Sequence, residues 1–169
     1  MVSNNYINII QDVDQAVAVL FDAGKWLEES GKNPSKYWQS KNMNRDFMLK
    51  QAEPHEFYVA LVNNIPAAAM ILQENQRNQD WKYIDKEKVV IALYVHWLCV
   101  AKAFKGQKLP KQMIEFAAKY AKSSNIKILR LDTSAKETKL MKIYEQLGFN
   151  LMGIEKEENR YTAFYQKEI

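Results

Sequence analysis

A long apolar run, from Val89 to Val100, constrains the fold of this chain more than any other segment. Only His96 is polar within its sequence VVIALYVHWLCV. A run that is apolar at nearly every position is typical of a strand buried on both faces in the middle of a sheet. It is too short to cross a bilayer, because a spanning helix needs about 20 such residues. The run therefore predicts a central strand at residues 89–100.

The sequence after this strand predicts a parallel neighbour. Residues 109–123 have the apolar spacing of an amphipathic helix, including Leu109 and Met113, and residues 126–131 have the composition of a strand. A strand, a helix and a second strand in this order form a right-handed crossover between parallel strands. Ligands bind such sheets beyond the carboxyl ends of the strands, so the segment that follows Val100 is the first place to look for a site.

The N-terminal part predicts a strand, two helices and a hairpin. Asp12 precedes a helical pattern and has Gln15 three residues later, the spacing of a capping box. Asn33-Pro34 restarts a helix, because proline loses no hydrogen bond at the first helical position. Asn63-Asn64 tolerates the positive φ of a tight hairpin turn. The expected strands are 6–10, 57–62 and 65–72, and the expected helices run from 13 to 30 and from 34 to 48.

The remaining segments predict a loop, a helix and a final hairpin. Residues 73–88 are polar and read as a loop, long enough to be functional. Ser134 and Glu137 occupy a second pair of capping-box positions, before a helix that ends at Gly148. The apolar face of this helix consists of Leu140, Ile143, Tyr144 and Leu147. The two strands after it are expected at 149–154 and 160–165. We expect one mixed α/β domain, residues 1–169.

Composition excludes several classes of protein. Cys99 is the one cysteine and there are two histidines, so we expect no intramolecular disulfide and no metal site. The N-terminus lacks a basic region before an apolar core, which argues against a signal peptide and for a cytoplasmic protein. The net charge of +4 is small for a dedicated nucleic-acid binder.

The basic residues are concentrated after the central strand. Residues 102–111 contain no acid and four lysines: Lys102, Lys105, Lys108 and Lys111. Such a cluster is either a solvated face or a site for a polyanionic ligand. The amides at the start of the helix that follows have no partner within the helix and suit an anion. The glycine patterns of nucleotide hydrolases and dinucleotide-binding folds are absent.

Two segments resemble motifs of the GNAT N-acetyltransferase superfamily. LCVAKAFKGQKLP, residues 98–110, is similar to the loop that binds the acyl-CoA pyrophosphate, with the pattern [Q/R]-x-x-G-x-[G/A]. LRLD at 129–132, followed by IYEQLGF at 143–149, resembles the L-R-L-D and [F/Y]-Y-E-x-x-G-F block. The predicted order of elements is also that of the family, so the resemblance covers nearly the whole chain.

The resemblance implies a fold and a cofactor. The fold would be a central mixed twisted sheet of about seven strands flanked by four helices, splayed between strands 89–100 and 126–131, with pantetheine in the gap. Acetyl-CoA would be the cosubstrate and a primary amine the acceptor. The residues that the resemblance assigns to CoA are Leu98, Cys99, Val100, Lys105, Gly106, Gln107, Lys108, Leu109, Pro110, Lys111, Glu137 and Met141. Packing alone also explains Cys99, and helix capping also explains Glu137.

The loop departs from the family pattern at all three consensus positions. Lys105 stands at the first, Lys108 at the first glycine and Pro110 at the second. Lys108 needs a negative φ unless the loop accepts strain, and Pro110 has no N–H to offer. The extra lysines would compensate by bringing positive charge near the phosphates.

The resemblance assigns a general acid but no clear base. Tyr144 would protonate the departing CoA thiolate, which suits a phenol that is protonated at pH 7. The same position on an apolar helix face also fits a core tyrosine. His96 is the first choice of base because imidazole titrates near neutrality, although a structural role fits it too. Glu56 and Glu74 are weaker choices.

The family geometry would place several aromatic residues near the acceptor, any of which also fits a core position: Trp26, Tyr37, Trp38, Trp81 and Tyr83. Two other functions stay open, a non-catalytic acyl-CoA sensor or inactive homologue and a basic nucleic-acid-binding protein. No membrane partner is expected, and the chain would be a monomer or a homodimer.

Overall fold

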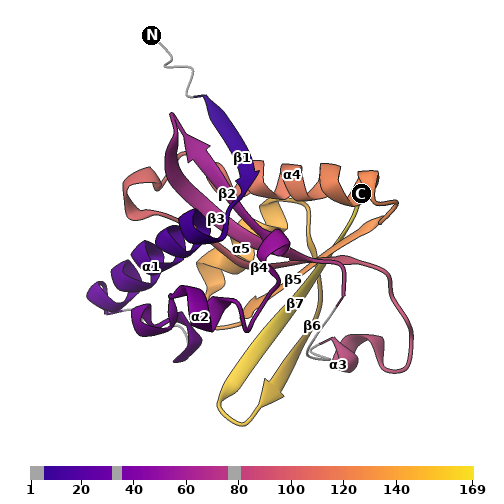
Figure 1. The fold of residues 1–169 in the computed structure, drawn as a ribbon. Coiled ribbons are helices and arrows are strands. Elements are labelled where there is room, and N and C mark those ends of the chain that lie inside the picture. The colour runs from indigo at the N-terminus through magenta and orange to yellow at the C-terminus, as the bar shows by residue number, and fades with distance from the viewer. Residues whose placement is uncertain (1–5, 32–35, 76–80) are drawn as a thin grey trace. The chain divides into compact units, whose positions relative to one another are not determined.

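The fold is a mixed α/β fold with one seven-stranded sheet. The computed structural model describes residues 6–31, 36–75 and 81–169. The strands follow the order β1-β2-β3-β4-β5-β7-β6 across the sheet (Figure 1). The strands are β1 (Ile7–Gln11), β2 (Phe57–Val62), β3 (Ile65–Gln73), β4 (Leu93–Val100), β5 (Ile128–Ser134), β6 (Asn150–Glu157) and β7 (Arg160–Glu168). The expected fold class and the order of the strands along the chain are confirmed.

The described residues contain five α-helices rather than the four expected, because a short helix, Lys82–Asp85, forms in the segment predicted as a loop. They are α1 (Val13–Glu29), α2 (Arg45–Met48), α3 (Lys82–Asp85), α4 (Leu109–Ser123) and α5 (Thr138–Gln146). None of the helices within the described ranges is long and apolar enough to cross a membrane.

The chain groups into two compact units. The N-terminal unit comprises Met1–Leu72 and Trp97–Phe116, and the C-terminal unit comprises Gln73–His96 and Ala117–Ile169. Each unit has its own buried cluster. In the N-terminal unit α1 packs on β2 and α2, and in the C-terminal unit a smaller cluster surrounds Trp81.

Asp12 starts α1 as predicted, through half of a capping box. Its carboxylate accepts a hydrogen bond from the Gln15 amide at 2.9 Å, which holds the pKa of Asp12 below its usual value. The Gln15 side chain does not reach back to the Asp12 amide and instead donates to the Asp12 carboxylate, at 2.9 Å. The helix ends at Glu29 and Gly31 follows with φ 69°.

The predicted second helix is wrong over its described part. The chain forms two 3-10 turns, at Lys36–Trp38 and Ser40–Asn42, and then the short α2. The amide and hydroxyl of Ser40 both donate to the Glu28 carboxylate, at 2.7 and 2.8 Å, and Asn44 caps α2. These side-chain bonds satisfy the backbone at each new turn, so a continuous helix is not needed. The expected start at Asn33-Pro34 lies outside the described residues.

The hairpin of β2 and β3 is confirmed. Asn63 and Asn64 occupy the turn with φ 50° and 65°, the left-handed region that asparagine tolerates. The second expected hairpin, β6 and β7, is confirmed as well, and its register runs from Asn150↔Gln166 to Glu157↔Arg160.

The central strand is shorter than its apolar run. β4 begins at Leu93, so the prediction that 89–92 belongs to the buried strand is wrong. Val90 and Ala92 pack against the C-terminal cluster, whereas Val89 is 94% exposed and Ile91 is 72% exposed. Only one side of this segment is buried. Because every residue of the segment is apolar, the sequence has no apolar–polar alternation that would show which side faces solvent.

The crossover that the sequence predicted is present. β4 and β5 are parallel, and their pairing is confined to Leu93↔Leu129 and Tyr94↔Arg130, which agrees with the expected splay. The capping box expected at Ser134 is wrong, because β5 continues to Ser134 and pairs it with Thr162. α5 then begins at Thr138, and the Glu137 side chain forms no cap there.

Candidate functional site

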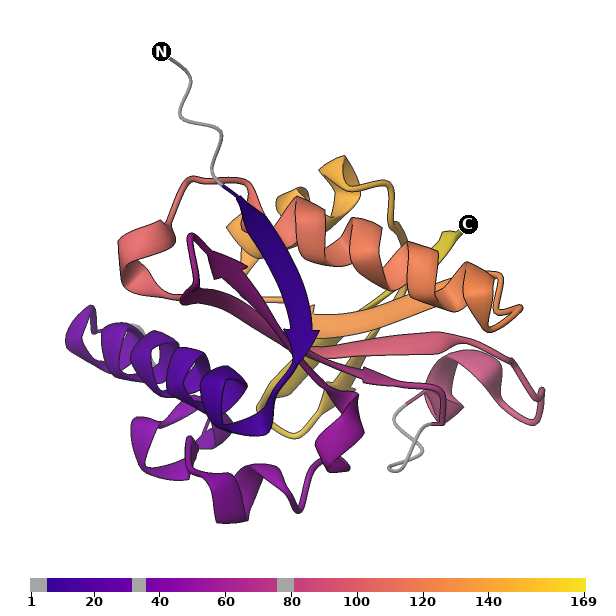
Figure 2. The ribbon, with the colours of Figure 1, turned by 45° about the horizontal axis from the view of Figure 1, so that its top comes forward.

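A basic loop joins β4 to α4 in the N-terminal unit, and we call residues 101–108 the basic loop. It lies beside α1 (Figure 2). Its entry is fixed by the Ala101 amide, which donates to the carbonyl of Ala67 at 2.8 Å. A 3-10 turn, Lys102–Phe104, follows, and then Gly106 and Lys108 take positive φ values of 81° and 57°. The loop therefore accepts the strain that the sequence flagged at Lys108, in a conformation that glycine adopts without cost.

Backbone N–H groups at the start of α4 are available to an anion. Within residues 101–112, all of which the structure describes, the amides of Gly106, Lys108 and Leu109 have no acceptor. Pro110 has no N–H, as the sequence implied. α4 is 15 residues long, so its N-terminal end adds a favourable field for negative charge. Unpartnered amides in one short segment at a helix start are suited to an anion such as phosphate.

The four lysines of the cluster take different positions. The ammonium of Lys105 lies 3.5 Å from the centre of the Trp26 ring, a cation–π contact. Lys111 is 3.8 Å from Glu115 one turn along α4, an exposed pair that holds the charge weakly. Lys102 and Lys108 are exposed. Lys108 and Lys111 thus keep charge close to the free amides, whereas Lys105 turns toward α1.

The end of β4 that leads into the basic loop is strained. Trp97 has φ 56°, a left-handed conformation that is an outlier for a bulky residue. Its ring packs against Trp38, with ring centroids 5.0 Å apart. The next residues, Leu98 to Val100, are half-buried. Such outliers persist where the surrounding structure imposes them, and they cluster at functional sites.

The Cys99 thiol is not a nucleophile near neutral pH. Burial raises the pKa of Cys99 to about 12, against a smaller lowering by a backbone hydrogen bond at Ala69. A thiol with this pKa stays protonated, and thiolates rather than thiols attack carbon. The packing of Cys99 against the N-terminal cluster fits a structural side chain.

Tyr144 lies in the C-terminal unit and is the buried residue of α5. Its ring packs against Phe149 and Tyr165, with centroids 6.2 and 6.0 Å away. The Tyr165 hydroxyl donates to Glu145 at 3.1 Å, and burial followed by this bond raises the pKa of Tyr165 to about 12. The Tyr165 hydroxyl is thus protonated at neutral pH. Glu137, immediately before α5, and Met141 on α5 are also assigned to CoA and are half-buried.

The residues considered as bases already make structural contacts. The half-buried His96 ring lies parallel to Tyr94, with centroids 6.3 Å apart and 7° between planes. Glu74 accepts a hydrogen bond from the Tyr120 hydroxyl at 3.0 Å. The Glu56 carboxylate accepts from the Glu53 amide at 2.7 Å and so caps a 3-10 turn.

The aromatic residues expected near an acceptor are divided between the units. Trp26 and Trp38 are half-buried in the N-terminal unit, where Tyr37 is exposed. In the C-terminal unit Tyr83 is exposed, but Trp81 is among the largest fully buried side chains. Trp81 thus has the contacts of a core residue.

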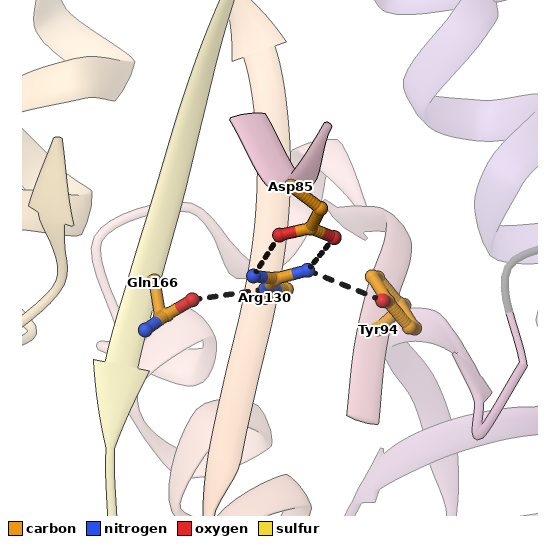
Figure 3. Close-up of polar contacts among 4 residues, drawn as sticks. All are labelled: Asp85, Tyr94, Arg130 and Gln166. Atoms are coloured by element: carbon orange, nitrogen blue, oxygen red, sulfur yellow. Dashed lines mark hydrogen bonds and ion pairs between the residues drawn. The ribbon is translucent and has the colours of Figure 1, made fainter. Parts of the chain in front are cut away.

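A buried ion pair beneath Trp81 was not visible in the sequence. Arg130 on β5 donates two hydrogen bonds to Asp85 at 2.6 and 2.7 Å, one to Gln166 at 2.9 Å and one to Tyr94 at 3.4 Å (Figure 3). Its guanidinium lies 4.1 Å from the centre of the Trp81 ring. Burial disfavours the charge, but the bonds to Asp85 and Tyr94 outweigh it and raise the pKa of Arg130. The pair anchors α3, within the predicted loop, to the sheet.

Comparisons with known proteins bear on the family and the fold. The sequence profile of the acetyltransferase (GNAT) family matches residues 23–149. An acetyltransferase of the GNAT family from Listeria monocytogenes 4b F2365 has a similar structure, with a TM-score of 0.77 and 24% identity over 100% of this chain and 98% of that one. One from Streptococcus agalactiae 2603 gives 0.77 and 18%, over 98% and 99%.

A third similar structure contains a ligand. It is the PaiA N-acetyltransferase of Thermoplasma acidophilum in complex with coenzyme A, with a TM-score of 0.70 and 15% identity over 97% of this chain and 99% of that one. At these identities the likeness establishes the fold alone. No curated protein matches the sequence.

Proposed function

Because the chain belongs to the acetyltransferase (GNAT) family, we propose that it transfers an acetyl group from acetyl-CoA to a primary amine. The observation that carries this proposal is the set of unpartnered amides at Gly106, Lys108 and Leu109, in a loop that contains no acid. Such amides complement the pyrophosphate of CoA.

The residues present fit CoA despite the substituted loop. Lys108 adopts a left-handed φ, so its amide is presented as that of a glycine would be. Lys108 and Lys111 would supply charge to the pyrophosphate or the 3′-phosphate, and Gln107 lies between the free amides. The backbone of Leu98 to Val100 would pair with pantetheine and hold the thioester carbonyl.

The reaction is direct attack. The neutral amine attacks the thioester carbon, the new C–N bond forms, and the C–S bond breaks to release the CoA thiolate. Tyr144 would donate its proton to that thiolate. The proton lost by the amine would pass to His96, to Glu56 or Glu74, or to water, and water fits best with the structural contacts that the three side chains already make.

Two measurements, made one after the other, test the proposal. Calorimetry should first show that CoA binds, with affinity that falls as salt rises because phosphate contacts are screened. A panel of amines is then assayed by release of free thiol from acetyl-CoA. Turnover of any amine supports the enzyme, and binding without turnover of any amine favours a sensor or inactive homologue. Absence of CoA binding, together with binding of nucleic acid, would refute both.

Tyr144→Phe tests the general acid. The variant removes one hydroxyl, so CoA affinity should be nearly unchanged while kcat falls about 10²-fold or more. Tyr161→Phe, a tyrosine of β7 to which we assign no catalytic role, is the matched control. Equal kcat in parent and Tyr144→Phe would assign Tyr144 to the core alone.

A further inference from the structure

The basic loop is connected to α1 by a hydrogen bond from its backbone and by a cation–π contact from one of its side chains. The carboxylate of Asp22 accepts a hydrogen bond from the amide of Lys102 at 2.7 Å. Four residues later, and hence on the same face of α1, the ring of Trp26 receives the ammonium of Lys105 at 3.5 Å. Both contacts lie within the N-terminal unit.

These contacts hold a loop that packing holds incompletely. Between α1 and the loop lies an open pocket of about 310 Å³, lined by Ala18, Val19, Asp22, Pro66, Ala101, Ala103 and Phe104. Beyond the buried Ala101, most of the loop is exposed. Two of its residues nevertheless keep left-handed φ angles, and Lys108 is not glycine. A strained conformation persists only where surrounding contacts determine it.

We propose that Asp22 and Trp26 are positioning residues for the CoA loop, and that Lys105 acts through Trp26 rather than as a phosphate ligand. This inference rests on the proposed function. In the parent protein the loop amides are already arranged for the pyrophosphate. When either contact is lost, binding must order the loop, and the affinity for CoA falls accordingly.

The role assigned to Lys105, which acts through Trp26, can be distinguished from the role of a lysine that binds phosphate directly. A lysine that touches phosphate contributes independently of Trp26, and its loss reduces the salt dependence of binding. A lysine that acts through Trp26 loses its whole contribution when Trp26 is replaced, so the two substitutions are not additive. The two roles therefore predict different double-variant cycles.

The experiment is calorimetric titration with CoA of Lys105→Met, Trp26→Leu and the double variant, at about 50 and about 300 mM salt. Each single variant should raise Kd about 2- to 5-fold, the range for an exposed cation–π contact. The double variant should be no weaker than the weaker single one. Lys105→Arg should restore parent affinity, because a guanidinium also stacks on tryptophan.

Lys108→Met is the matched control. It removes a lysine assigned to phosphate, so its effect should add to that of Trp26→Leu, and it should flatten the salt dependence that Lys105→Met leaves intact. Asp22→Ala should weaken CoA binding about 10-fold, as expected for a lost hydrogen bond to a charged group, again with unchanged salt dependence. Asp14→Ala, on the same helix, controls for removal of an acid and should leave Kd unchanged.

The possible results are distinct. Additive effects of Lys105→Met and Trp26→Leu, or a flattened salt dependence in Lys105→Met, would overturn the inference while the proposed function stands. Unchanged affinity in both Asp22→Ala and Lys105→Met, which alter exposed residues and should fold, would overturn it equally. A parent protein that does not bind CoA at all would refute the proposed function itself.

Discussion

The buried pair of Arg130 and Asp85 predicts a large loss of stability when one partner is neutralised. The perturbation is Asp85→Asn, which keeps the volume of the side chain and removes its charge. Arg130 has a side chain only 3% exposed, and that of Asp85 is 15% exposed. The guanidinium cannot move into water without disrupting Trp81 and Tyr94, on whose rings it lies.

The magnitude follows from this burial. An unpaired charge in such a site destabilises a protein by about 3 to 5 kcal/mol. Because Asp85 is partly exposed and Gln166 still binds the guanidinium, the lower end applies, and we expect a loss of about 3 kcal/mol. For a chain of this size that corresponds to a melting temperature lower by about 6 to 12 °C.

The chain supplies its own control. Arg45 and Asp14 form an ion pair with the same closest distance, 2.6 Å, but their side chains are 51% and 78% exposed. Asp14→Asn should therefore cost less than about 1 kcal/mol. Denaturant unfolding of both variants and the parent measures the difference. Equal losses in the two variants, or less than about 1 kcal/mol for Asp85→Asn, would refute the argument from burial.

Three further predictions concern single residues. Asp12→Ala should lower the free energy of unfolding by about 1 kcal/mol. Because the pKa of Asp12 is lowered in the fold, the free energies of unfolding of parent and variant, measured in denaturant, should converge as the pH falls below about 4. Cys99 should be alkylated far more slowly at pH 8 in the folded chain than in denaturant, and stability should decline above about pH 8.5, where the unfolded thiol ionises and the folded one does not. Lys108→Gly should raise the melting point, by relief of about 1 kcal/mol of left-handed strain, yet weaken the salt dependence of CoA binding.

Periodic segments were predicted well because their signal is local. The helix at 109–123 and both hairpins are present, since apolar spacing and turn residues act over a few positions of the chain. The second helix failed where distant side chains decided the outcome, as Glu28 does by binding the Ser40 amide. The predicted capping box at Ser134 failed because the pairing of β5 with β7 extends over that residue.

The site shows the same division. The basic loop was identified from its lysines and Gly106, but its connection to α1 depends on Asp22 and Trp26, about 80 residues away in sequence. Asp85 and Arg130 are 45 residues apart, and neither stands in a pattern that pairs it with the other. A charge pair formed by the fold leaves no periodic trace in the sequence.

The sequence indicated backbone strain at Lys108 but gave no sign of it at Trp97. Trp97 in β4 and Lys108 at the end of the basic loop have φ values of 56° and 57°, although glycine would occupy either position at lower energy. Because tryptophan and lysine rarely adopt a left-handed φ, their presence in a sequence argues against left-handed turns at these positions. If stability alone had selected them, glycine would be expected at both, so their side chains must offset the strain in another way. For Trp97 the contact with Trp38 is such a contribution, and for Lys108 the proposed contribution is attraction between its charge and the phosphates of bound CoA. The strain at Trp97 is thus offset by packing within the fold, whereas the strain at Lys108 is consistent with the phosphate role proposed for its charge.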